Sequence, residues 1–524
     1  MSARRGRWSG SCFNARPRHA GATASRSSPL TRPPCRLRCH PLLAFAPLSL
    51  LFSFALPAMA QSDTLPITGV LGVENVRLPD GEHLGLVGGT LLFDAGADWS
   101  FGPAVYGAVS GRRGGFFVGG VEVQRRWRLG RGWGLATGLY AGGGGGAAAP
   151  VGDGLMLRPA VTLWKDVGPS LQLGLSWSAV RFPSGTIDSR QLGLTMAWRG
   201  EFRHLAEHDG GNVPNQSTGL GFDRMAMTAS TYRIDDRNGR RIGLVGARAE
   251  RRAGLDGLSW GIEAAAAAQG DAAGYMEILG TAAFSVEPAP SALPGWRIGV
   301  RGGVGAGGGG AVPTGGGLMT KLTGTVEWRV APGWTLGGDY GDVRSTNGPL
   351  RARQAQVWVG MSLEPDLDGR GANTDAAVRS EWVGVWQHHT RRTRIDGTTR
   401  ALDTIGLKLN RDLGEHVYVS GQAHSAFAGS AGAYSIGLVG LGVTTRPATN
   451  LRVGAEMLAG AAGGGGVQAG GGAIVQGLAW AGWSVPDRGE WRAGLGAVRS
   501  LRGGGSHSPV IELAWSRAFG MAAR

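Results

Sequence analysis

The sequence predicts an all-β fold: a transmembrane antiparallel β-barrel built from three internal repeats of about eight strands each, about 24 strands in total. Three observations lead to this prediction. One spacing recurs along the chain, apolar and polar residues alternate with a period of two, and the composition is rich in glycine, with 95 Gly among 524 residues. Because only 17% of the residues are charged, an extended, glycine-tolerant structure is favoured over a helical enzyme.

The first 60 residues have the character of an export signal. They hold nine arginines and no Asp or Glu, followed by an apolar stretch from Pro41 to Leu56. Ala58 and Ala60 then flank Met59 in the small-x-small pattern that signal peptidase accepts. We therefore expect a signal peptide over residues 1–60, cleaved after Ala60. All three cysteines lie within it, so the mature chain would form neither a disulfide nor a thiolate metal site.

The formal charge of +15 suggests a nucleic-acid partner, but the leader accounts for much of it. Without residues 1–60, 44 basic residues stand against 38 acidic ones. The remaining arginines are scattered through strand-like segments and form no dense basic patch. We therefore expect no nucleic-acid partner.

The repeats are identified by markers that recur at two fixed offsets, 163 and 155 residues. Four sets of residues fall on these offsets: Trp133, Trp296 and Leu451; Gly145, Gly308 and Gly463; Gly154, Gly317 and Gly472; and Arg181, Arg344 and Arg499. The expected boundaries are residues 61–200, 223–366 and 380–524 for the three repeats, with polar linkers at 201–222 and 367–379.

Within each repeat the period is two. Leu322, Val326 and Trp328, for example, alternate with Lys321 and Glu327. Successive side chains of a strand point to opposite faces, so these segments are strands with one apolar and one polar face. No helical periodicity competes with this pattern.

Alternation also fits a soluble sandwich, so the case for a membrane barrel needs further support. Long two-faced strands without cysteines would leave open edges, whereas closure pairs every backbone group. The even strand count and short connections fit the same class. Tryptophans at presumed strand ends suit an interfacial aromatic girdle: Trp133, Trp164, Trp198, Trp296, Trp328, Trp334, Trp480, Trp483 and Trp491.

The preferred architecture is one 24-stranded ring, formed by joining the three repeats edge to edge. The alternative is three small barrels or three soluble β domains in a row. Strand parity places the glycine tract from Gly142 to Gly154 between the fifth and sixth strands, on the same side as the turn after Arg181.

The segment from Val510 to Phe519 resembles the terminal strand by which the outer-membrane assembly machinery recognises its clients, although Gly520 to Arg524 follow the aromatic residue. The resemblance is to bacterial outer-membrane β-barrel proteins as a broad class. It implies the bacterial outer membrane as location. It also implies membrane lipid, lipopolysaccharide and the barrel assembly machinery as partners.

Two sets of residues are candidates for a pore mouth or rim. The glycines Gly145, Gly308 and Gly463 lie in tracts without the Gly-Lys-Ser/Thr ending of a phosphate loop, so we expect them to permit tight hairpins, bends or close approach of strands. In a sharper hypothesis, the three hairpins line the barrel mouth. Arg181, Arg344 and Arg499 could attract lipopolysaccharide phosphates, or could simply be solvated turn residues.

We expect no enzymatic activity, no cofactor and no metal. His507 and Ser508 are the one neighbouring pair that resembles a catalytic dyad, loosely like that of lipid-A deacylase barrels, but no carboxylate can be placed beside them. The histidines His388, His389, His416 and His424 occur in the third repeat alone.

A single large ring with inward polar residues would enclose water, which predicts a wide pore for export or uptake of a polar polymer or solute. Two alternatives stay open: a non-conducting structural or surface-assembly barrel, and a secreted soluble β-repeat protein.

Overall fold

The computed structural model describes residues 64–204, 218–236, 239–288, 293–363, 377–445, 450–485, 488–502 and 507–522. The expected signal peptide, with Ala58 and Ala60, lies outside these residues. Among the described residues, no helix is long and apolar enough to cross a membrane.

The described chain forms 24 strands, which close into three separate barrels of eight. The strands of the first barrel are β1 (Thr64–Arg77), β2 (His83–Gly96), β3 (Trp99–Ser110), β4 (Phe117–Gly130), β5 (Trp133–Gly145), β6 (Met156–Asp166), β7 (Leu171–Arg181) and β8 (Asp188–Arg203). Those of the second are β9 (Arg224–Ile234), β10 (Arg241–Arg252), β11 (Leu258–Gln269), β12 (Met276–Val286), β13 (Trp296–Gly308), β14 (Leu318–Ala331), β15 (Trp334–Ser345) and β16 (Arg351–Ser362). Those of the third are β17 (Ala377–Thr393), β18 (Thr399–Asp412), β19 (Val417–Ala428), β20 (Ser435–Thr444), β21 (Leu451–Gly463), β22 (Ala473–Val485), β23 (Gly489–Ser500) and β24 (His507–Ala522).

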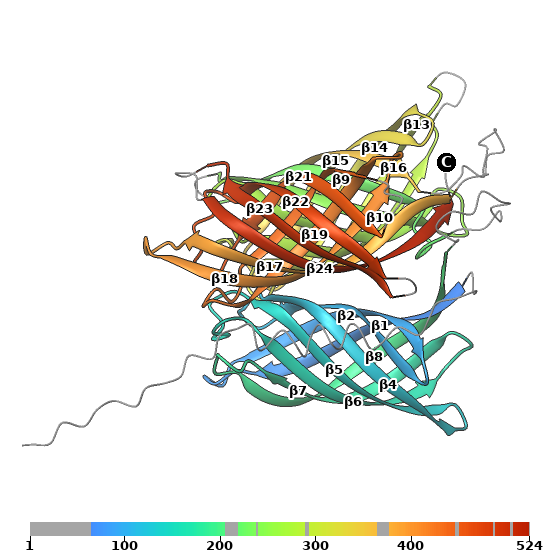
Figure 1. Cartoon of the computed structure of the whole chain (residues 1–524). Helices are drawn as coiled ribbons and strands as arrows, with labels where there is room; N and C mark the ends of the chain where they lie inside the picture. Colours follow the sequence, from blue (N-terminus) through green and yellow to red (C-terminus); the bar gives the residue numbers. More distant parts are fainter. Residues whose placement is uncertain are drawn as a thin grey trace, which may run out of the picture. The chain divides into compact units, whose positions relative to one another are not determined.

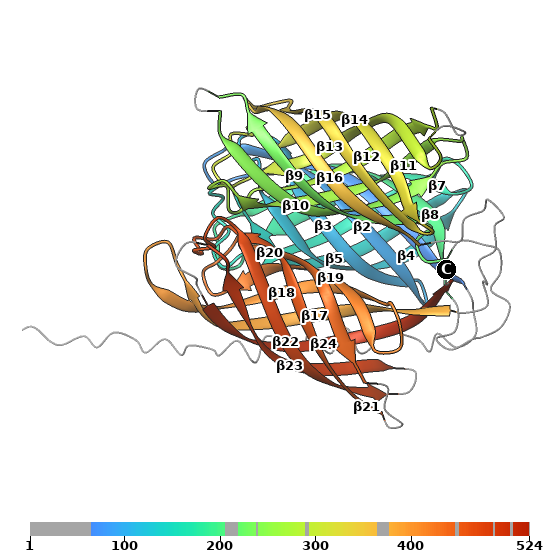
Figure 2. The same ribbon diagram turned by 90° about the horizontal axis from the view of Figure 1, so that it is seen from above.

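The all-β barrel prediction is confirmed, but the prediction of one 24-stranded ring is wrong. In each barrel the first strand pairs with the eighth: Val70 lies opposite Ala197, and Val385 lies opposite Ala514. In the second barrel β16 likewise pairs back to β9. The eighth strand therefore has no free edge to offer the next repeat, and each repeat satisfies its own backbone groups. Figure 1 shows the barrel of β1 to β8 in blue to teal. Figure 2 shows the barrel of β9 to β16 in green to yellow and that of β17 to β24 in orange to red.

The strand pattern sorts side chains by polarity in the reverse of a soluble protein. Large apolar residues lie on the outside, such as Leu192 and Leu194 at 64% exposure each, whereas charged residues such as Glu263 and Arg248 are buried inside. An apolar exterior and a polar interior are the arrangement that transmembrane β-barrels have in common.

Outward exposure, which an interfacial girdle requires, is met by most of the predicted tryptophans and is not met by two of them. Trp133, Trp198 and Trp483 are exposed on the outside, as an interfacial position requires. Trp164 and Trp480, however, are 3% and 5% exposed and point into their barrels. Sequence position near a strand end does not reveal which of the two faces a residue occupies.

Each barrel contains, near one end, a cluster of buried apolar side chains. In the first barrel this cluster includes Phe116, Tyr140, Met156 and Phe182. Equivalent clusters form around Tyr275 in the second barrel and Tyr434 in the third. The clusters lie at the hairpins that join odd strands to the following even strands, where the glycine tracts also lie.

Candidate functional site

Most of the buried charged side chains of the described chain lie in the barrel lumens. The interior of an eight-stranded barrel is just wide enough for side chains to fill it. Alternation along each strand aims every second residue inward. Where these inward residues are ionic, removal from water is costly unless each charge finds an opposite charge and hydrogen bonds. The three lumens contain different sets of ion pairs and hydrogen bonds.

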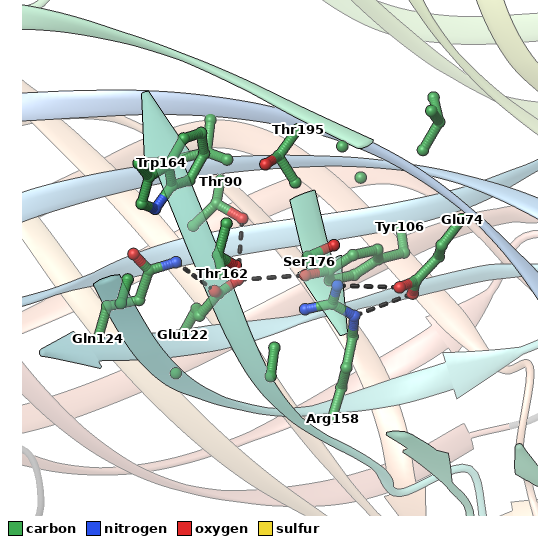
Figure 3. Close-up of a pocket in the computed structure, with 17 residues that line it drawn as sticks. Glu74, Thr90, Tyr106, Glu122, Gln124, Arg158, Thr162, Trp164, Ser176 and Thr195 are labelled. Atoms are coloured by element: carbon green, nitrogen blue, oxygen red, sulfur yellow. Dashed lines mark hydrogen bonds and ion pairs between the residues drawn. The ribbon is translucent and has the colours of Figure 1, made fainter. Parts of the chain in front are cut away.

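The first lumen contains one bidentate ion pair and a separate buried carboxylate. Arg158 donates from Nε and Nη2 to the two carboxylate oxygens of Glu74, each at 2.9 Å, and Ser178 Oγ donates to Glu74 at 2.6 Å. Glu122 accepts from the hydroxyls of Tyr106 and Thr90, both at 3.1 Å. Figure 3 shows the two carboxylates reached from opposite sides, Glu74 by Arg158 and Glu122 by Tyr106 and Thr90.

A cavity of about 30 Å³ lies among these groups in the first lumen. Its lining includes Glu74, Glu122, Arg158 and Trp164 (Figure 3). A space of this size has room for about one or two water molecules, and the polar lining offers them partners.

The second lumen has the densest ionic network. Lys321 Nζ lies 2.7 Å from Glu263 and 3.1 Å from Glu277. Arg248 Nη1 lies 3.1 Å from both Glu263 and Asp339. These five side chains are at most 2% exposed. Tyr232 and Tyr275 donate their hydroxyls to Glu277 at 2.6 and 2.8 Å, so that carboxylate has three donors.

A second cluster in the same lumen continues the network. Arg224 lies between Glu250 and Glu327, with its Nη1 2.9 Å from Glu327, and Arg301 pairs with Glu250. The guanidinium groups of Arg224 and Arg248 both lie 4.9 Å from the ring centroid of Trp358, which adds cation–π attraction.

The third lumen also contains buried ion pairs. Lys408 Nζ lies 2.9 Å from Glu456 and 3.2 Å from Glu512. Arg452 lies 2.9 Å from Glu381, which also pairs with Arg492. All of these carboxylates and the lysine are at most 3% exposed.

The candidate glycines lie at the ends of equivalent strands, Gly145 in β5, Gly308 in β13 and Gly463 in β21. All three are buried, and a Cβ on Gly145 would lie 2.6 Å from the side chain of Val151. Gly308 and Gly463 pack against backbone: a Cβ on Gly308 would lie 2.5 Å from the amide nitrogen of Gly115, and one on Gly463 would lie 2.1 Å from that of Gly274. The receiving glycines belong to a different barrel in both cases. At Gly308 and Gly463, the absence of a side chain therefore allows the backbones of two barrels to approach closely.

The candidate arginines lie on the outside of three different barrels. Arg181, Arg344 and Arg499 each follow an inward valine, so alternation turns them outward, and all three are exposed. Arg181 pairs with Asp188 across its own hairpin at 3.2 Å. In the part of the chain that the structure describes, no hydrogen bond or ion pair joins one of these arginines to another.

The histidines and the His507 and Ser508 pair are dispersed over both faces of the third barrel. His507 is exposed while Ser508 is fully buried, so these neighbours point to opposite faces and cannot act on one substrate. His389 and His424 are buried in the lumen at 0% and 2% exposure, whereas His388 is paired with Asp403 at 2.8 Å. Over the described ranges, no group of three or more His, Cys, Asp or Glu side chains is arranged to hold a metal ion.

The lumen residues were not among the candidates drawn from the sequence, although a signal for them was present. Glu74, Arg158, Lys321 and Glu456 are ionic residues in the middle of segments with period-two alternation. In a barrel of eight strands such positions must be inside and must pair. These residues can be assigned to the lumen only when the number of strands in each barrel is known.

Comparison with known proteins finds other barrels at low similarity. No family model and no curated protein matches the chain. A solved structure of OccK2 (OpdF) from Pseudomonas aeruginosa in complex with glucuronate is 11% identical and aligns over 87% of this chain and 98% of its own, with a TM-score of 0.24. The FrpB iron transporter from Neisseria meningitidis is 10% identical over 89% of this chain and 83% of its own, with a TM-score of 0.29. A BenF-like porin from Pseudomonas fluorescens Pf-5 is 10% identical over 87% and 98%, with a TM-score of 0.23. At these TM-scores the likenesses carry no argument about the function of this chain.

Proposed function

We propose that this protein is a structural component of the outer membrane whose three barrels are closed to solutes. The supporting observation is the filling of the second and third lumens by paired charges that are almost fully buried, together with the apolar clusters near one end of every barrel. A wide pore for a polar polymer or solute was predicted from the lumen of a single large ring. A lumen that closes on eight strands holds its own side chains instead.

For partners, we propose outer-membrane lipid along the apolar exteriors and the barrel assembly machinery at the terminal strand β24. Lipopolysaccharide phosphates could meet the exposed arginines Arg181, Arg344 and Arg499 at one rim of each barrel.

Conductance across a planar bilayer tests the proposal. The full mature chain is expected to insert without producing large, steady conductance steps. Large steps at the wild-type sequence would contradict it, because they require an open lumen.

A second candidate is a narrow path for water or small ions through the first barrel, and the cavity beside Glu74 and Arg158 favours it. Arg158→Ala would remove the guanidinium that spans this lumen, so small conductance steps should appear or increase. Arg181→Ala is the matched control, since its side chain lies outside the same barrel. An unchanged baseline in the Arg158→Ala variant would argue against this path.

A further inference from the structure

The glycine-rich hairpin of the second barrel contacts the first barrel through backbone. The amide of Gly114 donates to the carbonyl of Gly315 at 2.8 Å. From the hairpin between β15 and β16, the side chain of Asn347 also donates through Nδ2 to the carbonyl of Val109 at 2.7 Å. A Cβ on Gly115 would lie 2.1 Å from the amide nitrogen of Gly309. Two backbones can approach this closely only where neither carries a side chain.

The same contact recurs between the other barrels. A Cβ on Gly274 of the second barrel would lie 2.8 Å from the amide nitrogen of Gly464 in the third. In the third barrel, the carbonyl of Ala426 would lie 2.7 Å from a Cβ on Gly143 of the first. Thus the tract of the second barrel meets the first, that of the third meets the second, and that of the first meets the third.

The receiving surface has its own repeat, distinct from that of the tracts. Ala108, Ala267 and Ala426 are 159 residues apart, and a Cβ on Gly317, Gly472 or Gly154 would lie 2.0 to 2.7 Å from their respective carbonyls. Each barrel therefore has two different surfaces, a glycine tract and a receiving surface that contacts the glycine tract of another barrel. Such head-to-tail interfaces generate a ring when the rotation closes.

The contact between the first and third barrels is the informative one, because neither is the chain neighbour of the other. The amide of Ser430 donates to Asp153 Oδ1 at 2.6 Å across 277 residues of sequence. Phe202 and Phe519 lie with ring centroids 5.1 Å apart, and Phe93 and Trp382 lie 6.0 Å apart. A linker between consecutive barrels does not enforce these contacts.

We propose that the glycine tract of each repeat is a docking surface for a neighbouring repeat of the same chain, and that the three surfaces close the barrels into an intramolecular ring with a fixed direction. The first barrel receives the second, the second receives the third, and the third receives the first. This assembly is independent of whether the lumens conduct. It explains why glycines recur at equivalent positions of the three tracts while lumen residues differ from repeat to repeat.

Engineered disulfides test both the ring and its direction, because the mature chain has no cysteine after the expected cleavage at Ala60. In the full-length protein in outer membranes, Asp153→Cys with Ser430→Cys should give an oxidised species of altered mobility on denaturing gels, abolished by reduction. The matched control pairs Asp153→Cys with Asp271→Cys. Asp271 lies at the position of Ser430 one repeat earlier, with a φ of 53° against 54°.

The ring predicts a disulfide in the first pair and none in the control. Disulfides in both pairs would overturn the direction. Absence in both, repeated with a flexible bifunctional maleimide, would overturn the ring.

A glycine variant tests the docking surface itself. In the Asp153→Cys and Ser430→Cys background, Gly143→Val places side-chain atoms against the carbonyls of Ser425 and Ala426, so the disulfide yield should fall several-fold. Gly89→Val, whose Cβ would meet nothing within 4 Å, should leave the yield unchanged. Equal yields in the two variants would contradict a docking role for the tract.

Discussion

Single charged residues in this protein fall into two groups with very different energetic weight. Lys321 is 2% exposed in its side chain and lies within 3.1 Å of both Glu263 and Glu277. Arg344 is 58% exposed and lies 3.8 Å from Asp342. Removing one member of a buried network leaves uncompensated charge, whereas an exposed pair is screened by water.

We therefore predict that Lys321→Met lowers the free energy of unfolding by about 3–5 kcal/mol, because Glu277 loses its one cationic partner among the described residues. Arg344→Met in the same barrel should cost about 0–1 kcal/mol. Urea unfolding in lipid vesicles, followed by tryptophan fluorescence, measures both. Similar losses in the two variants would argue that water reaches the second lumen freely.

From the sequence, the glycines were expected to permit tight hairpins, bends or close approach of strands. In the structure, Gly308 and Gly463 lie against backbone of another barrel. The partner of that approach could not be found from the sequence, because Gly115 and Gly274 lie in two other hairpins, β3 to β4 and β11 to β12, that bear no glycine tract. Lys321 and Arg158 were missed since alternation alone leaves an inward charge indistinguishable from a solvated one.

Strands in this chain carry their apolar face outward, as the exposed Leu192 and Leu194 of β8 illustrate. The position and two-faced character of the strands could be predicted, because period-two alternation is a local property. The partner of an end strand is not local. Whether β8 pairs with β1 or with the next repeat depends on curvature and stagger, which leave no pattern in one sequence.

The outward face provides a test that separates lipid from water. Leu194→Arg places a charge in the middle of β8 and should cost about 2–4 kcal/mol if that face meets hydrocarbon. Leu255→Arg, in the hairpin between β10 and β11 and 70% exposed, should cost about 0–1 kcal/mol. The folding free energy into vesicles compares them. A neutral Leu194→Arg would show that β8 faces water.

The whole molecule is a set of three independently closed barrels in which each repeat completes its own sheet. An eight-strand estimate for each repeat was within reach of the sequence, and three small barrels or three soluble β domains were the alternative to one ring. The single ring was favoured because edge-to-edge joining also removes open edges. In the structure, short hairpins and the pairing of β1 with β8 also leave no open edge. The resulting small barrel lacks the wide lumen of a single ring.

Disulfide trapping across that seam decides between the two architectures. Leu71 lies opposite Met196 in the β1 and β8 ladder, and both side chains face outward at 42% and 38% exposure. Leu71→Cys with Met196→Cys should form a disulfide in the folded protein, while Leu71→Cys with Leu513→Cys, the pairing of one continuous ring, should form none. A disulfide in the second pair and not in the first would overturn the three-barrel structure.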